Sequence, residues 1–177
     1  MAKIDIKDEV AHGREKVFKT FRDDLQALIP HLPDVKDIKV KDRKDIDDTT
    51  VQVVNLWKAE AEEIPRIARP FIKPEMLEWT DTATWREDQW ECEWVIKVGF
   101  LSDAVSCKGK TRYLAKGDDK TEVTITGNLD VDAREIPGVP RIGAGKIGDV
   151  IEGFVVRLIT PNLTNINRGL ERYLKDS

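Results

Sequence analysis

The sequence contains little cysteine, little histidine and no long apolar run, and each shortage excludes a class of protein. Only two cysteines, Cys92 and Cys107, occur in 177 residues, so the chain is not a disulfide-stapled domain. Neither the two cysteines nor the two histidines, His12 and His31, have the C-x-x-C or H-x-x-x-H spacing of zinc ligands, so no zinc site is predicted. No run reaches the ~18 apolar residues of a membrane span. The first residues contain no apolar core typical of a secretory signal, so we expect a cytoplasmic protein.

The charge and composition indicate a single globular domain over residues 1–177. Hydrophobic residues make up 40% of the chain and charged residues 35%, with a net charge of −4. A net acidic chain is a poor match for the phosphate backbone, so nucleic acid is not expected as a partner. We expect an apolar small molecule or lipid, at most transient membrane contact, and leave a protein partner open.

Two short motifs resemble nucleotide-binding signatures but lack the required context. Gly143–Gly148 matches G-x-G-x-x-G, yet the segment 136–140 separates it from any strand and no βαβ unit surrounds it. Gly109-Lys110-Thr111 is similar to the end of a P-loop, but Ala104 occupies the upstream glycine position. No G-x-S-x-G elbow occurs. The sequence therefore predicts no cofactor, no metal site and no catalytic residue, and leaves open whether the protein is an enzyme.

Alternating and helical apolar patterns predict seven strands and a few helices. The Lys41–Asp48 stretch, rich in both charges, is predicted to be a hairpin loop. The expected helices cover 14–28, one or two turns within 60–74, and 143–177, because apolar residues recur there at helical spacing. Pro30 and Pro33 end the first region, and three prolines interrupt the second. The expected strands are 3–10, 35–40, 49–59, 76–85, 89–98, 105–114 and 121–131.

The strands have one apolar and one polar face, as expected of an antiparallel sheet covered on one side. The 121–131 strand, for example, sets Val123, Ile125 and Leu129 against Glu122 and Thr124. A long terminal helix with an apolar face is the natural cover for that sheet. Because one helix cannot easily fill a curved seven-stranded sheet, we expect a residual pocket between the two, unless tryptophan side chains fill it.

Several polar and aromatic residues fall on the inward face of the predicted strands. Asn55, Asp81 and Tyr113 share that face, as does Asp8. A buried polar group needs a partner, so these residues either bond internally or contact the polar end of a ligand. An aspartate beside tryptophans, such as Asp81, is expected to have a raised pKa. The tryptophans themselves are explained either by core packing or by lining an apolar pocket.

The two cysteines are predicted to lie far apart on neighbouring strands. If residues 101–104 form a hairpin loop, Cys92 lies opposite Tyr113 and Cys107 opposite Val98. The thiols are then on the order of 20 Å apart along the strands, too far for a disulfide.

The order of elements resembles the START-like or SRPBCC superfamily, which has the helix-grip fold of the birch pollen allergen, START domains and aromatase/cyclases. The strand-to-helix opening Val10–Phe18, the segment Ile136–Pro140 and the late Pro161-Asn162-Leu163 carry the resemblance. It covers the whole chain and is similar to bacterial members of unknown function. A looser likeness is to PRELI-type phospholipid-transfer proteins.

The resemblance implies an α+β helix-grip fold: a curved, antiparallel, seven-stranded sheet around a long C-terminal helix, with short helices after the first strand. It also implies an apolar cavity, in which family members bind lipids, sterols, polyketides or plant hormones. We expect binding or transport of a lipid-like molecule, reached past residues 136–148 or 64–74. The alternatives are a polyketide cyclase/dehydratase using Asp81 or Tyr113, and a protein-interaction module with a closed core. The predicted ligand-binding residues are Asn55, Trp57, Trp79, Asp81, Trp85, Cys92, Trp94, Tyr113, Ile147, Ile151 and Phe154.

Overall fold

A seven-stranded antiparallel sheet forms the body of the molecule. The computed structural model describes residues 2–60, 64–73 and 77–177. The strands lie in the order β1-β7-β6-β5-β4-β3-β2, with every neighbouring pair antiparallel. Their bounds are β1 Ala2–Val10, β2 Val35–Asp45, β3 Thr50–Ala59, β4 Glu78–Arg86, β5 Glu91–Lys97, β6 Val105–Ala115 and β7 Thr121–Val131.

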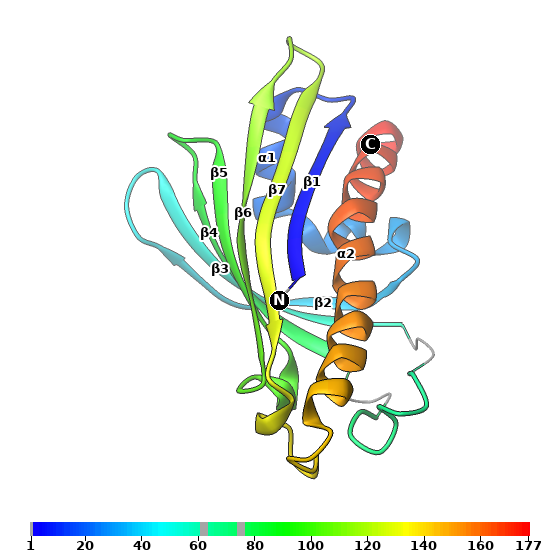
Figure 1. The fold of residues 1–177 in the computed structure, drawn as a ribbon. Coiled ribbons are helices and arrows are strands. Elements are labelled where there is room, and N and C mark those ends of the chain that lie inside the picture. The colour runs from blue at the N-terminus through cyan, green and yellow to red at the C-terminus, as the bar shows by residue number, and fades with distance from the viewer. Residues whose placement is uncertain (1, 61–63, 74–76) are drawn as a thin grey trace.

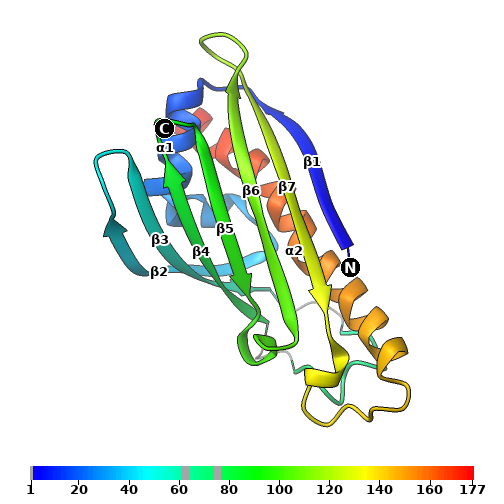
Figure 2. The ribbon, with the colours of Figure 1, turned by 60° about the vertical axis from the view of Figure 1, so that its left-hand side comes forward.

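The helices lie on one side of this sheet. The long helix α2 (Ala144–Asp176) crosses the concave face, and α1 (Arg14–Asp23) and the 3-10 helix η1 (Leu25–His31) lie on the same side (Figures 1 and 2). Two short 3-10 helices, η3 (Gly99–Leu101) and η4 (Ala133–Glu135), follow β5 and β7. The predicted α+β helix-grip architecture is confirmed.

Alternation along the strands produces the single apolar face. In β5, Cys92, Trp94 and Ile96 are buried while Glu93 and Val95 are exposed. The same period of two buries Val123, Ile125 and Leu129 of β7. The buried sides of these strands therefore face α2, as the sequence predicts.

Two glycines make room for a tryptophan in the curved part of the sheet. Gly109 and Gly127 are register partners on β6 and β7, and Gly109 also pairs with Trp94 of β5. A Cβ atom added at Gly109 would collide with the Thr126 carbonyl oxygen and lie 2.5 Å from the Trp94 ring. One added at Gly127 would lie 2.8 Å from the same ring. Glycine at both positions thus permits the backbones to approach and the indole to lie across them.

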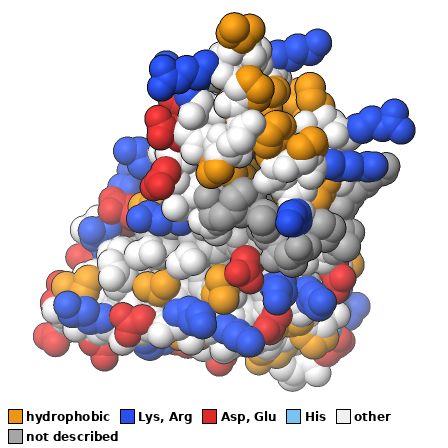
Figure 3. Space-filling model, turned by 90° about the horizontal axis from the view of Figure 1, so that it is seen from below, with side chains coloured by type: hydrophobic (Ala, Val, Ile, Leu, Met, Phe, Trp, Pro, Cys, Tyr) orange, Lys and Arg blue, Asp and Glu red, His pale blue; other side chains and the backbone are white. Residues whose placement is uncertain are grey.

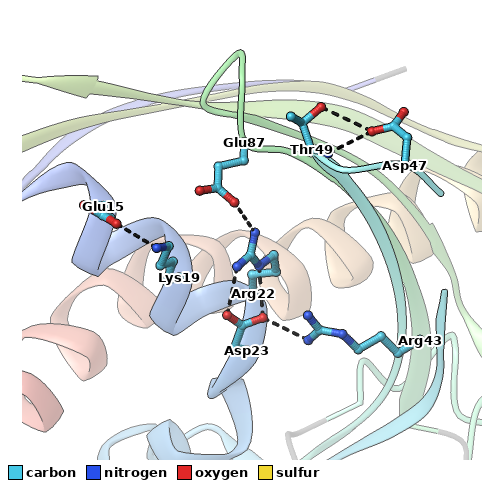
Figure 4. Close-up of polar contacts among 8 residues, drawn as sticks. All are labelled: Glu15, Lys19, Arg22, Asp23, Arg43, Asp47, Thr49 and Glu87. Carbon is cyan, nitrogen blue, oxygen red and sulfur yellow. Dashed lines mark hydrogen bonds and ion pairs between the residues drawn. The ribbon is translucent and has the colours of Figure 1, made fainter. Parts of the chain in front are cut away.

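The region predicted as one helix over residues 14–28 is divided in two. α1 ends at Asp23, and η1 continues as a 3-10 helix that contains Pro30. Ion pairs fix α1 to the sheet: Arg22 contacts Glu87 in the β4–β5 turn at 2.9 Å, and Asp23 accepts from Arg43 of β2 at 2.9 Å (Figure 4).

The prediction that Lys41–Asp48 is a hairpin loop is wrong in its first half. β2 continues to Asp45, with Arg43 opposite Val53. The exposed outer half of β2 shows no apolar alternation, so the pattern gave no strand signal. Only the turn remains, where Asp47 Oδ1 accepts hydrogen bonds from the Thr49 amide and hydroxyl (Figure 4).

The predicted register between β5 and β6, which sets the residue opposite each cysteine, is also wrong by two positions. Cys92 lies opposite Thr111, and Cys107 lies opposite Ile96. The connection between β5 and β6 contains η3 and is longer than the expected loop, which shifts the register. Both cysteines are buried free thiols.

Polar contacts tie the last part of α2 to β1 and to the segment after η1. Arg168 contacts the Asp8 carboxylate at 2.7 Å, and Asn167 donates to Asp8 Oδ2 at 3.0 Å. Asn165 donates to Asp34 Oδ2 at 3.1 Å. Within the described residues, no helix combines the length and the apolar character needed to cross a membrane.

Candidate ligand pocket

A pocket of about 100 Å³ lies between the concave face of the sheet and the second half of α2. Five neighbouring strands, from β3 to β7, supply most of its walls, because their inward positions alternate toward the same side. α1, η1 and α2 complete it. The lining residues are Phe21, Leu25, Asn55, Trp57, Trp79, Asp81, Ala83, Trp85, Cys92, Trp94, Ile96, Thr111, Tyr113, Val123, Ile125, Leu163, Ile166 and Asn167.

Aromatic rings dominate the walls. Trp57 and Trp79 are register partners on β3 and β4, and their rings stack with centroids 5.7 Å apart and planes 14° apart. Trp85 stacks on Tyr113 with centroids 6.1 Å apart. Phe18 of α1 meets both rings edge-on, at 5.1 and 5.5 Å, and so holds them from behind. Packed aromatic rings therefore form much of the pocket wall.

Three polar atoms in this apolar surrounding have no hydrogen-bond partner within the described part of the chain: Asn55 Oδ1, Trp57 Nε1 and Asp81 Oδ1. Asn55 and Asp81 are direct register partners across β3 and β4, so their side chains share the inward face. An unpaired buried polar atom costs about 1–3 kcal/mol. The Trp57 indole interacts with Asp81, so a small movement can pair these two groups, whereas Asn55 Oδ1 and the remaining acceptor capacity of Asp81 need a partner from outside the chain.

Among the described residues that line the pocket, Asp81 is the only acidic one. Removal of its carboxyl from water raises its pKa to about 7. The nearby Trp57 indole offsets part of this increase, although its N–H has no partner of good hydrogen-bond geometry. Part of the Asp81 surface remains accessible, consistent with its position on the pocket wall. The predicted raised pKa of this group is thus supported.

The other polar residues near the pocket are already paired or are difficult to ionise. Trp94 Nε1 donates to Thr111 Oγ1 at 3.1 Å. Despite partial burial, hydrogen bonds from Arg168 and Asn167 hold the pKa of Asp8 below its usual value. Burial raises the pKa of Tyr113 and Cys92 well above their usual values. Asp8 therefore has an internal structural role, and Asp81 is left as the group that can change charge near neutral pH.

The pocket gathers eight of the predicted ligand-binding residues and excludes three. Ile147, Ile151 and Phe154 do not line it; Leu163, Ile166 and Asn167 take their place. Phe154 precedes Leu163 on the same helix by about 13 Å of axial rise. Ile151 and Phe154 are buried in the core instead. The eight residues that do line the pocket are Asn55, Trp57, Trp79, Asp81, Trp85, Cys92, Trp94 and Tyr113.

The apolar pattern of the sequence does not indicate that α1, η1 and the second half of α2 contribute to the pocket. Phe21 and Leu25 belong to a helical apolar face that was visible in the sequence, but nothing in that pattern shows which residues border a space. Asn167, a polar residue between Ile166 and Leu170, was not predicted to line the pocket. Its position on the buried face of α2 was the available signal.

At the opposite end of α2, the segments 64–73 and 136–148 lie side by side, since a Cβ atom added at Gly138 would lie 3.8 Å from the Phe71 ring. Figure 3 views this end and shows hydrophobic side chains gathered among Lys and Arg. Ile142 is 95% exposed and Ile67 41%. The two segments contain Arg66, Arg69, Lys73, Arg141 and Lys146 but no acidic residue.

No cluster of His, Cys, Asp and Glu with metal-binding geometry is found in residues 2–60, 64–73 and 77–177. Burial raises the pKa of Cys107 to about 12. With both thiols buried and hard to ionise, neither is a metal-binding or nucleophilic thiolate in this state.

Comparison with solved structures shows that the chain has the START-like helix-grip fold. A protein of Thermus thermophilus, TTHA0849, matches with a TM-score of 0.66 and 19% identity over 99% of both chains. The Zhui aromatase/cyclase from Streptomyces sp. R1128 matches with a TM-score of 0.64 and 13% identity, over 98% of this chain and 95% of that one. A START superfamily protein from Mycobacterium smegmatis matches with a TM-score of 0.55 and 14% identity over 99% of both.

Sequence comparisons give no such match. The chain matches no protein-family model and no curated protein. The likeness is therefore one of fold.

Proposed function

We propose that this protein binds an apolar small molecule in the pocket between the sheet and the second half of α2. The observation that carries the proposal is the aromatic-walled pocket with three buried polar atoms that lack partners. Closed cores rarely leave such atoms unpaired. The START-like fold, shared with an aromatase/cyclase and a START superfamily protein, supports the same interpretation.

The pocket volume limits the ligand. About 100 Å³ is below the roughly 300–1,000 Å³ of sites for drug-sized molecules and closer to a ~150 Å³ cavity that accepts benzene. We infer that the part of the ligand held here is one ring or a short alkyl chain. A long-chain lipid requires α2 or the neighbouring segments to move outward.

We propose that ligands reach the pocket past the end formed by 64–73 and 136–148. Hydrophobic side chains are exposed there, whereas the other end of α2 is held by Arg168 and Asn165. Hydrogen exchange measured with and without ligand tests this route. Unchanged protection in both segments would exclude it.

Native mass spectrometry of the purified protein, followed by organic extraction, tests the binding function itself. We expect a stoichiometric adduct, or uptake of added toluene seen by ¹H–¹⁵N chemical-shift changes at β3, β4 and β5. Ile166→Phe should fill the pocket and abolish uptake, whereas Ile147→Phe, outside the pocket, should not. A bare protein that takes up nothing would favour the closed-core interaction module.

A second candidate function is acid–base catalysis of the cyclase/dehydratase type. The observation in its favour is Asp81, whose pKa of about 7 suits proton transfer at neutral pH. Turnover of a polyketide-like ketone that disappears in Asp81→Asn, with the ligand still bound, would establish it. Binding without turnover would leave a carrier or sensor.

A further inference from the structure

We infer that the pocket selects a ligand with a protonated amine beside its apolar part, and that Asp81 and Asn55 accept hydrogen bonds from that ammonium group. This inference rests on the proposed binding function and names its ligand class. It follows from the geometry of the acceptors, the aromatic walls and the absence of any cation in the lining.

The two unpaired acceptor oxygens are adjacent, and both can accept hydrogen bonds from an ammonium group. Asn55 Oδ1 and Asp81 Oδ1 have no partner of good hydrogen-bond geometry within the described residues, and the two side chains are opposite each other on β3 and β4. The Trp57 indole N–H, which interacts with Asp81, is a single donor and leaves acceptor capacity on the carboxylate. Directly opposed residues have Cβ atoms about 4.5–5.5 Å apart. An ammonium group has three donors and no acceptor, so one such group can satisfy both oxygens.

The aromatic walls favour the same charge. Trp57, Trp79, Trp85, Trp94 and Tyr113 line the pocket. The faces of such rings attract cations, most strongly where water is excluded. A negative ligand would face both these ring faces and the Asp81 carboxylate, so the electrostatics disfavour it.

No cation among the described residues lies in the pocket wall beside Asp81. The described lining residues include no lysine, arginine or histidine. The basic residue of α2 closest in sequence to the pocket, Arg168, is bound to Asp8 and Glu171. A buried carboxylate without a counter-ion is costly, and a cationic ligand would offset that cost.

The same arrangement makes binding depend on pH. The titratable groups that interact with Asp81 are Cys92, Cys107 and Tyr113, and burial raises the pKa of all three above the neutral range. α2 contributes Leu163, Ile166 and Asn167 to the pocket, none of which titrates. Among the described residues that line the pocket, Asp81 is therefore the one that changes charge between pH 6 and 8. Since the ammonium binds the carboxylate form, its affinity should rise with pH through that range.

Benzylamine and benzyl alcohol form a matched pair of one-ring probes that differ in the charged group. We would measure the binding of both probes by isothermal titration calorimetry at pH 6 and pH 8. At pH 8, benzylamine should bind about tenfold or more tightly than benzyl alcohol. This preference for benzylamine over benzyl alcohol should shrink at pH 6 and disappear in the Asp81→Asn variant. Asp118→Asn, an exposed control that removes the same charge, should retain it.

A measurement on the unaltered protein covers the case in which Asp81→Asn does not fold. Titration at pH 7 in two buffers of different ionisation enthalpy should show release of up to about half a proton when benzylamine binds, because Asp81 is about half protonated there. Benzyl alcohol should release none. Equal or weaker binding of benzylamine, with benzyl alcohol still bound, would overturn the amine inference and leave the binding function intact. If neither probe binds, both are overturned.

Discussion

Replacing Gly109 by alanine should destabilise the protein by about 3 kcal/mol, the upper part of the range for overpacking. The added methyl group would collide with the Thr126 carbonyl oxygen and lie 2.5 Å from the Trp94 ring. The carbonyl belongs to the backbone of a central strand and cannot move alone. The Trp94 ring can move only by disturbing its 3.1 Å hydrogen bond to Thr111. Neither neighbour can yield cheaply, which places the cost near the top of the range.

Chemical denaturation followed by far-UV circular dichroism measures this loss, which corresponds to roughly 6–12 °C in Tm for a chain of this size. Gly153→Ala is the matched control. No atom lies within 4 Å of the Cβ that it adds, and alanine favours a helix by up to about 1 kcal/mol. Trp94→Phe should reduce the cost of Gly109→Ala by about 1 kcal/mol in a double-mutant cycle. The reasoning is refuted if Gly109→Ala unfolds at the same denaturant concentration as the parent.

Three further predictions concern the core, the helix anchor and the thiols. Phe18→Ala, which removes a fully buried ring in contact with three aromatic neighbours, should cost about 3–5 kcal/mol in the same denaturation assay. Arg168→Ala should cost about 1 kcal/mol above pH 5, an amount reduced because the Arg168 side chain is 42% exposed. The bonded state lowers the Asp8 pKa, so this contribution is present above the unfolded pKa and is lost as the pH falls through the folded pKa. A difference between the two proteins that does not shrink as the pH is lowered would contradict this prediction. Cys92 and Cys107 should react with iodoacetamide only at the rate of unfolding, because burial raises the pKa of both thiols, and fast labelling of the folded protein would show that the thiols are accessible.

The sequence predicted the sheet well where apolar and polar residues alternate strictly. β7 was predicted with its observed bounds, and the apolar faces of β5 and α2 were identified correctly. The outer half of β2 was missed, since Lys41–Asp45 is exposed on both sides and has no alternation to detect. Hydrophobic periodicity reports burial, so a strand without a buried face leaves no such signal.

The same limit explains why three of the predicted residues do not line the pocket. Periodicity shows which face of α2 is buried. It does not show which turns of the helix border the pocket and which pack against other side chains. Ile151 and Phe154 were therefore predicted to line the pocket, where the structure has Leu163 and Ile166. All the predicted strand residues line the pocket, because in-phase positions on adjacent strands necessarily share one surface. Gly109 was considered only as part of a nucleotide motif. Gly109 lies close to Trp94 because of the register of β5, β6 and β7, and this register cannot be derived from the sequence pattern alone.

The concentration of indoles around one small space has a spectroscopic consequence. Four of the five tryptophans line the pocket, and the fifth, Trp90, lies outside it beneath the Arg14 guanidinium. Intrinsic fluorescence therefore comes mainly from the pocket, and emission from Trp90 can be removed by Trp90→Phe. The near-parallel stacking of Trp57 and Trp79 should couple their electronic transitions and produce an exciton signal in the circular dichroism spectrum. A molecule that entered between the helix and the sheet would change both signals, so the protein carries a reporter of its own occupancy.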